Sequence, residues 1–171
     1  WVITTEAAPG VTPVSASVLE QRLMALTGRD YPFEVKRGDR PNEIIVDWRY
    51  ADAKWFDLMR VAGLKRTFRL TLRLDEGDHA ARVMDSYAEL NWSAGAGGAN
   101  LSFTRNYGIN FIAYERGTVL GFQFKNGMPT LDPTYSWRFN LNDMRGPVAE
   151  VVTGSGWTYK PVITFFRPVG G

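Results

Sequence analysis

Basic residues are concentrated near the middle of the chain, and they are the strongest candidates for binding chemistry. The members of this basic cluster are Lys65, Arg66, Arg69, Arg73 and Arg82. No acidic residue between Leu58 and Leu74 neutralises it within the sequence. Guanidinium and ammonium groups gathered in this way bind lipid head groups, acidic partners, polyanionic wall polymers or nucleic acid. We therefore predict that these five residues bind a ligand.

A second interpretation of the basic cluster stays open. Arginines on one strand of a sheet can pair with acids on its neighbours, and Glu89 is one candidate partner. Charge runs are more often solvated faces than binding sites. For the cluster taken by itself this second interpretation is favoured, and the partners of the arginines decide between the two.

The sequence contains no recognisable catalytic arrangement. Cysteine is absent, which excludes thiol nucleophiles, disulfides and Cys-ligated metals. The single histidine, His79, follows the acidic stretch 75–78 and is expected to be a turn residue rather than a general base or a metal ligand. Asp85 and Glu89 share one face of a predicted strand, but the four-residue spacing separates them by roughly 13 Å, too far for a glycosidase pair. We predict no catalytic residue, no metal site and no cofactor.

Two stretches resemble nucleotide or nucleic-acid motifs only superficially. The glycine-rich residues 93–100 lack the lysine and the following helix of a phosphate-binding loop, so they indicate a flexible connection or a bulged hairpin. Residues 114–119 lack the aromatic pattern of RNA-recognition strands. A nucleic-acid partner is therefore not expected.

The second half of the chain is rich in aromatic side chains. They are Phe103, Tyr107, Phe111, Tyr114, Phe122, Phe124, Tyr135, Trp137 and Phe139. They either fill a core or line an apolar cavity of the kind that small-molecule and lipid binders have.

The basic cluster lies in the best-patterned part of the chain, residues 52–92. From 67 to 75 apolar and polar residues alternate without a break, which predicts a strand with Phe68, Leu70, Leu72 and Leu74 on its buried face. A shift of one residue would bury the arginines, so the register is tightly specified. A helix over 52–62 precedes this strand, a turn at 75–78 follows it, and residues 80–92 return as its partner.

The remaining elements follow from caps, turns and periodicity. A capping box of Ser17 and Glu20 predicts a first helix with Leu19, Leu23 and Leu26 on one face, ending at Gly28. A last helix starts at Asn142 or Asp143 and carries Met144, Val148, Val151 and Val152, with Pro147 tolerated in the first turn. Further strands are predicted at 33–37, 43–50, 101–105, 109–115, 119–125, 135–141 and 157–166.

These elements predict a single α+β domain over residues 15–171. We expect one extensive, curved antiparallel sheet of about eight strands with three short helices packed on one face. Residues 1–14 are rich in Thr, Ala, Gly and Pro and indicate a linker or an edge segment. No run of apolar residues is long enough to span a membrane. Because the chain starts with Trp1, we expect it to be part of a longer protein, tethered to a bacterial membrane or envelope.

The hypothesis from sequence is a non-catalytic binding or interaction module. Its ligand would be an apolar or anionic small molecule, a lipid or a protein partner. One alternative is a hydrolase-like enzyme whose carboxylates meet only in the fold. Another is a structural assembly domain, which would show a large exposed apolar patch.

Overall fold

The computed structural model describes residues 4–29, 31–49, 56, 60, 66–95, 98–107, 118–125, 128–138 and 141–165. Its elements, in chain order, are α1 (Ala16–Met24), the 3-10 turn η1 (Ala25–Gly28), β1 (Phe33–Arg37), β2 (Glu43–Trp48), β3 (Arg66–Asp75), β4 (Ala80–Gly95), β5 (Gly98–Tyr107), β6 (Thr118–Lys125), β7 (Met128–Arg138), α3 (Leu141–Gly154) and β8 (Thr158–Pro161). The class is α+β, as the sequence predicted.

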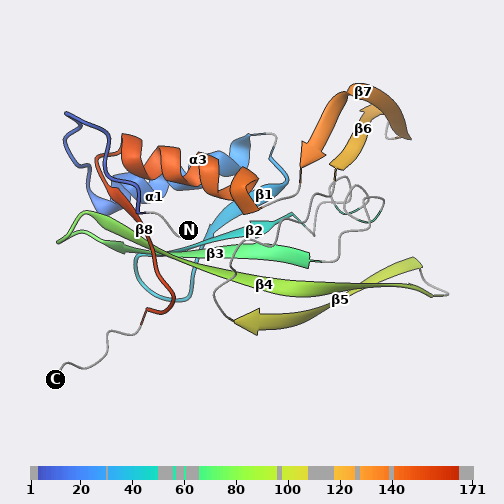
Figure 1. Cartoon of the computed structure of the whole chain (residues 1–171), viewed down its shortest axis with the longest axis horizontal. Coiled ribbons are helices and arrows are strands. Elements are labelled where there is room, and N and C mark those ends of the chain that lie inside the picture. The colour runs from blue at the N-terminus through green and yellow to red at the C-terminus, as the bar shows by residue number, and fades with distance from the viewer. Residues whose placement is uncertain are drawn as a thin grey trace.

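The main sheet is open, with strand order β1-β2-β3-β4-β5, and β8 pairs with β4 (Figure 1). The first five strands are antiparallel to their neighbours, whereas β8 is parallel to β4. Strands β6 and β7 form a separate two-stranded sheet. The prediction of one antiparallel sheet of about eight strands with three helices was therefore wrong in detail, since the described part has a six-stranded mixed sheet, a separate two-stranded sheet and the two helices α1 and α3. Local alternation identifies a strand, but the choice of partner depends on where α3 returns the chain.

Helices α1 and α3 lie on the same face of the main sheet (Figure 1). The buried face of β3 is the predicted one, with Phe68, Leu70, Leu72 and Leu74 all in the core. Each fully buried Leu or Phe contributes roughly 1.5–3 kcal/mol through removal of apolar surface from water. Burial of this face fixes the register of β3, so every second side chain of that strand projects from the opposite face. We call that opposite face the outer face.

The first helix starts earlier than predicted. Ser15, not Ser17, is its N-cap, and the Ser15 side chain accepts a hydrogen bond from the Val18 amide at 3.3 Å. Glu20 makes an ion pair with Arg37 instead of completing a capping box. The apolar face was predicted correctly, since Leu19, Leu23 and Leu26 are buried. The predicted helix at 52–62 lies outside the described residues except at positions 56 and 60.

Helix α3 begins at Leu141, so Pro147 falls beyond the first turn, where it removes one backbone hydrogen bond. Met144, Val148 and Val152 are buried, as predicted. The helix ends in a Schellman motif, with the Trp157 amide bonded to the Val152 carbonyl and the Gly156 amide to the Thr153 carbonyl. Gly156 has φ +81°, which favours glycine at this position.

The described residues of the N-terminal segment lie against α3 and β8. Thr5 forms an antiparallel bridge with Tyr159. The indole Nε1 of Trp157 donates to the Val14 carbonyl at 2.7 Å. A Cβ at Gly156 would come within 2.7 Å of the Pro13 backbone, so the helix end and this segment fit only without a side chain there.

The strands of the second half differ most from prediction. The glycine-rich stretch joins β4 to β5, since β4 continues to Gly95 and β5 begins at Gly98. Strand β7 starts at Met128, seven residues before the predicted start, although Pro129 and Pro133 lie in it. Proline is tolerated because both strands of a two-stranded sheet are edge strands. The predicted strand at 109–115 and the side chains of the aromatic residues between 103 and 139 lie outside the described part. No helix among the described residues is long and apolar enough to cross a membrane.

Candidate functional site

The predicted ligand-binding arginines lie on the outer face of the main sheet. Arg69 and Arg73 belong to β3 and Arg82 to β4. In the β3–β4 register Arg73 is directly opposite Arg82. Arg66 opens β3 opposite Glu89, and Lys65 lies outside the described residues.

Arg69, Arg73 and Arg82 each have an acidic partner. The β2–β3 register places Asp47 opposite Arg69 and Glu43 opposite Arg73. Arg69 Nε donates to Asp47 Oδ2 at 3.0 Å, and Arg73 Nε donates to Glu43 Oε2 at 3.1 Å. The carboxylates are nearly buried, with exposed fractions of 7% for Asp47 and 9% for Glu43. The outer face is therefore not an unneutralised positive surface.

Arg82 is paired within its own hairpin. Its Nη2 lies 3.2 Å from Asp75 Oδ2 and 3.5 Å from Asp78 Oδ2. Cross-strand and turn pairing, the interpretation left open by the sequence, thus holds for all three arginines. Their partners are acids of β2 and of the β3–β4 turn rather than Glu89, because β2 lies beside β3 in this sheet.

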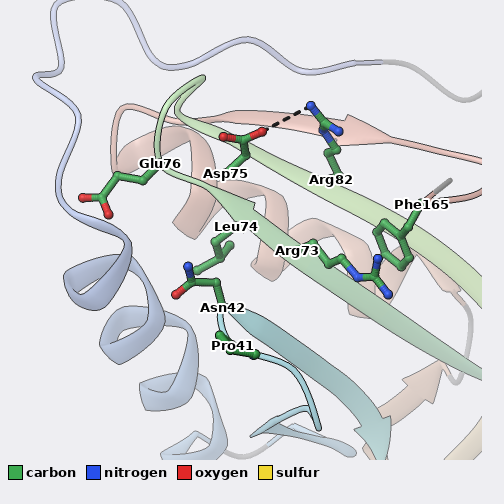
Figure 2. Close-up of a pocket in the computed structure, with 8 residues that line it drawn as sticks. All are labelled: Pro41, Asn42, Arg73, Leu74, Asp75, Glu76, Arg82 and Phe165. Carbon is green, nitrogen blue, oxygen red and sulfur yellow. Dashed lines mark hydrogen bonds and ion pairs between the residues drawn. The ribbon is translucent and has the colours of Figure 1, made fainter. Parts of the chain in front are cut away.

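A pocket of about 400 Å³ lies at the end of the β3–β4 hairpin (Figure 2). It is lined by Pro41, Asn42, Arg73, Leu74, Asp75, Glu76, Arg82 and Phe165. The lining comes from the β1–β2 turn, from both strands of the hairpin and from the segment after β8. Two of the five predicted ligand-binding residues, Arg73 and Arg82, thus meet in one pocket.

Both arginines of the pocket keep donor groups beyond their ion pairs. The guanidinium carbon of Arg73 lies 4.0 Å from the centroid of the Phe165 ring, which covers one face of the cation (Figure 2). Among the described residues, the buried Nε of Arg82 has no hydrogen-bond partner. Like charges directly opposite each other across two strands destabilise a sheet. In this pair the cost is offset, because Glu43 balances the charge of Arg73, and Asp75 and Asp78 balance that of Arg82.

Both carboxylates of the pocket have partners in the fold. Asp75 is held by Arg82, and its Oδ1 accepts from the Asp78 amide at 3.4 Å. Glu76 Oε1 accepts from the Ala16 amide at the start of α1, at 3.3 Å. No group of three or more acidic, His or Cys residues able to hold a metal occurs in the described part of the chain.

His79 lies in the β3–β4 turn with φ 43° and packs edge-on against Trp157, at 5.6 Å between ring centroids. Its carbonyl accepts a hydrogen bond from the Thr158 amide at 2.9 Å. These contacts agree with the predicted role as a turn residue. Asp85, one of the two acids that were predicted to share a strand face, makes an ion pair with Arg145 of α3.

A second polar cluster lies between α3 and the sheet. Tyr159 of β8 is buried, and its hydroxyl has no hydrogen-bond partner among the described residues. Burial raises the pKa of Tyr159 to about 12, while the positive charge of Arg145 acts in the opposite direction. Burial also lowers the pKa of Arg145. Unlike the residues around Arg73, these groups do not line the described pocket.

Comparison with protein-family models, with curated proteins and with solved structures finds no match for this chain.

Sequence reasoning found the arginines of the pocket but missed Asn42, Glu76 and Phe165. The pairing of Arg73 with Arg82 could be foreseen, because the predicted turn joins two strands of known register. Phe165 carried no such signal. It reaches Arg73 only because β8 pairs with β4 and the chain then continues past Val162, whose amide donates to the Val83 carbonyl at 2.8 Å.

Proposed function

We propose that this protein is a non-catalytic binding module that recognises a small molecule through an anionic group in the pocket between Arg73 and Arg82. The observation that carries the proposal is the placement of these two arginines directly opposite each other in one pocket. Each guanidinium group has N–H donors beyond those that make its ion pair. An oxyanion bound in this pocket would accept hydrogen bonds from these donors.

The unused donors support binding by hydrogen bonds. Among the described residues, Arg73 donates to Glu43 through Nε, Arg82 donates to its acids through Nη2, and the other donors of both groups make no ion pair. A guanidinium has five N–H donors in a fixed fork, so each arginine can also hold a carboxylate or phosphate oxygen. The pocket volume of about 400 Å³ is within the usual range for small-ligand sites.

The experiment is an NMR titration of the isotope-labelled protein with hexanoate and, separately, with inorganic phosphate. We expect shifts centred on the backbone amides of residues 73 and 82. Loss of a charge-assisted hydrogen bond, worth about 1.5–3 kcal/mol, predicts affinity about tenfold weaker or more in Arg73→Gln and in Arg82→Gln.

Arg69→Gln is the matched control. Arg69 is on the same strand and face and has the same kind of ion pair, but it does not line the pocket. Its affinity for both probes should stay within about twofold of the wild type, well below the loss of one charged hydrogen bond. If Arg73→Gln misfolds, Arg73→Lys takes its place. This variant keeps the positive charge that pairs with Glu43 but loses the planar fork of donors, so its affinity for the probes should also fall. Equal losses in the Arg69 and Arg73 variants, or no binding of either probe to the wild type, would overturn the proposal.

A further inference from the structure

The charged residues that line the pocket are of both signs. Arg73 and Arg82 are cationic, while Asp75 and Glu76 are anionic. Asp75 is paired with Arg82, and Arg73 is paired with Glu43 just outside the lining. Of the charged residues that line the pocket, Glu76 is the one that makes no ion pair within the described part of the chain.

Glu76 keeps a free acceptor. Its Oε1 accepts the hydrogen bond from the Ala16 amide, and its Oε2 makes no hydrogen bond with the described residues. The side chain is exposed and belongs to the lining of the pocket. Figure 2 shows Glu76 and Arg73 at opposite ends of the pocket, with Leu74 and Asn42 between them.

This arrangement discriminates among anions. A multiply charged anion would gain the arginine donors but would meet a lining in which both arginine charges are already balanced and Glu76 is uncompensated. A ligand that also carries a cation meets no such opposition, because its ammonium group would pair with Glu76. The gain from one such ion pair is about fivefold in affinity when unit charges lie about 4 Å apart in water.

We propose that the ligand is a zwitterion of the amino-acid class, with its carboxylate between Arg73 and Arg82 and its ammonium group at Glu76. This inference rests on the proposed function and names the chemical class that the same pocket takes. The carboxylate and the ammonium group would lie at opposite ends of the pocket, so an extended ω-amino acid is a suitable probe.

The test compares 6-aminohexanoate with hexanoate, which has the same carbon chain without the ammonium group. We expect 6-aminohexanoate to bind the wild-type protein about fivefold more tightly. N-acetyl-6-aminohexanoate, in which the amine is neutral, should lose this advantage. The comparison uses the wild-type chain alone and is independent of how any variant folds.

Variants then locate the effect. Glu76→Gln retains an oxygen for the Ala16 amide and removes the charge, so it should bind both probes equally and leave hexanoate affinity unchanged or improved. Asp39→Asn is the control, because Asp39 is an exposed acid in the β1–β2 turn near Pro41 but outside the lining. It should keep the preference for 6-aminohexanoate.

The two proposals fail in different ways. Equal binding of hexanoate and 6-aminohexanoate, both dependent on Arg73 and independent of Arg69, would overturn the zwitterion and leave the anion site standing. Loss of the preference in Asp39→Asn as well as in Glu76→Gln would also overturn it, because the effect would then be one of long-range charge. Absence of binding by both probes would overturn the anion site itself.

Discussion

Substitution of Tyr159 by phenylalanine should change how the stability of the protein depends on pH. The folded protein holds the Tyr159 hydroxyl in a buried position without a hydrogen-bond partner among the described residues. Burial raises the pKa of Tyr159 from the ordinary 10.0 to about 12, because a phenolate is poorly solvated there. Tyr159→Phe removes the titrating group and keeps the ring.

The sign of the effect follows from proton linkage. Between pH 10 and about 12 the folded state keeps the Tyr159 proton while the unfolded state loses it, so the folded state binds more protons and stability falls as the pH rises. The contribution is complete below pH 10 and is lost as the pH passes the folded-state pKa. Each pH unit corresponds to about 1.4 kcal/mol, so the full loss is about 3 kcal/mol.

Tyr159→Phe should escape this loss. Near neutral pH the variant should also be more stable than the wild type by about 1 kcal/mol, because it no longer buries an unsatisfied hydroxyl. The assay is urea unfolding followed by tryptophan fluorescence, at neutral pH and in steps between pH 10 and about 12. Tyr31→Phe, which alters a half-buried ring stacked on Phe33, controls for the loss of one phenol hydroxyl. A difference between wild type and Tyr159→Phe that is the same at every pH would refute the reasoning.

Two further substitutions test the packing of the fold. Gly156→Ala places a Cβ within 2.7 Å of the Pro13 backbone at φ +81°, so the free energy of unfolding should fall by about 3 kcal/mol. Chemical denaturation measures this loss, and a loss below about 1 kcal/mol would contradict the close approach of the two backbones. Asp47→Asn leaves the guanidinium of Arg69 without its nearly buried carboxylate, and we expect a loss of about 2 kcal/mol. Glu34, whose side chain is 39% exposed, provides the control. Glu34→Gln should cost less than about 1 kcal/mol, and equal effects would show that burial of the carboxylate does not matter.

The parts of the fold that could be predicted are those fixed by local pattern. The alternation of β3 determined its buried face, because leucines and arginines cannot exchange faces without burying charge. The start of α1 was missed because Ser15 and Ser17 are both suitable caps. The structure selects Ser15, which extends the helix to the buried Ala16, whose amide donates to Glu76.

Long-range pairing limited the prediction of the site. Arg69 and Asp47 are 22 residues apart in the chain, and Arg73 and Glu43 are 30 apart, so only the β2–β3 register reveals these pairs. The parallel pairing of β8 with β4 is likewise invisible to periodicity, which carries no information on strand direction. It is this pairing that directs Phe165 toward Arg73.

The contacts between the two ends of the chain have a consequence for synthesis on the ribosome. Trp157 is fully buried, and its indole donates to the Val14 carbonyl, so Val14 can make this contact only after 143 further residues have been synthesised. Until then the apolar face of β1–β4 lacks α3 and Trp157, and exposed faces of this kind favour aggregation. Newly made chains should therefore depend on chaperones until Trp157 has left the ribosome, and a chain truncated before Trp157 should be insoluble rather than partly folded.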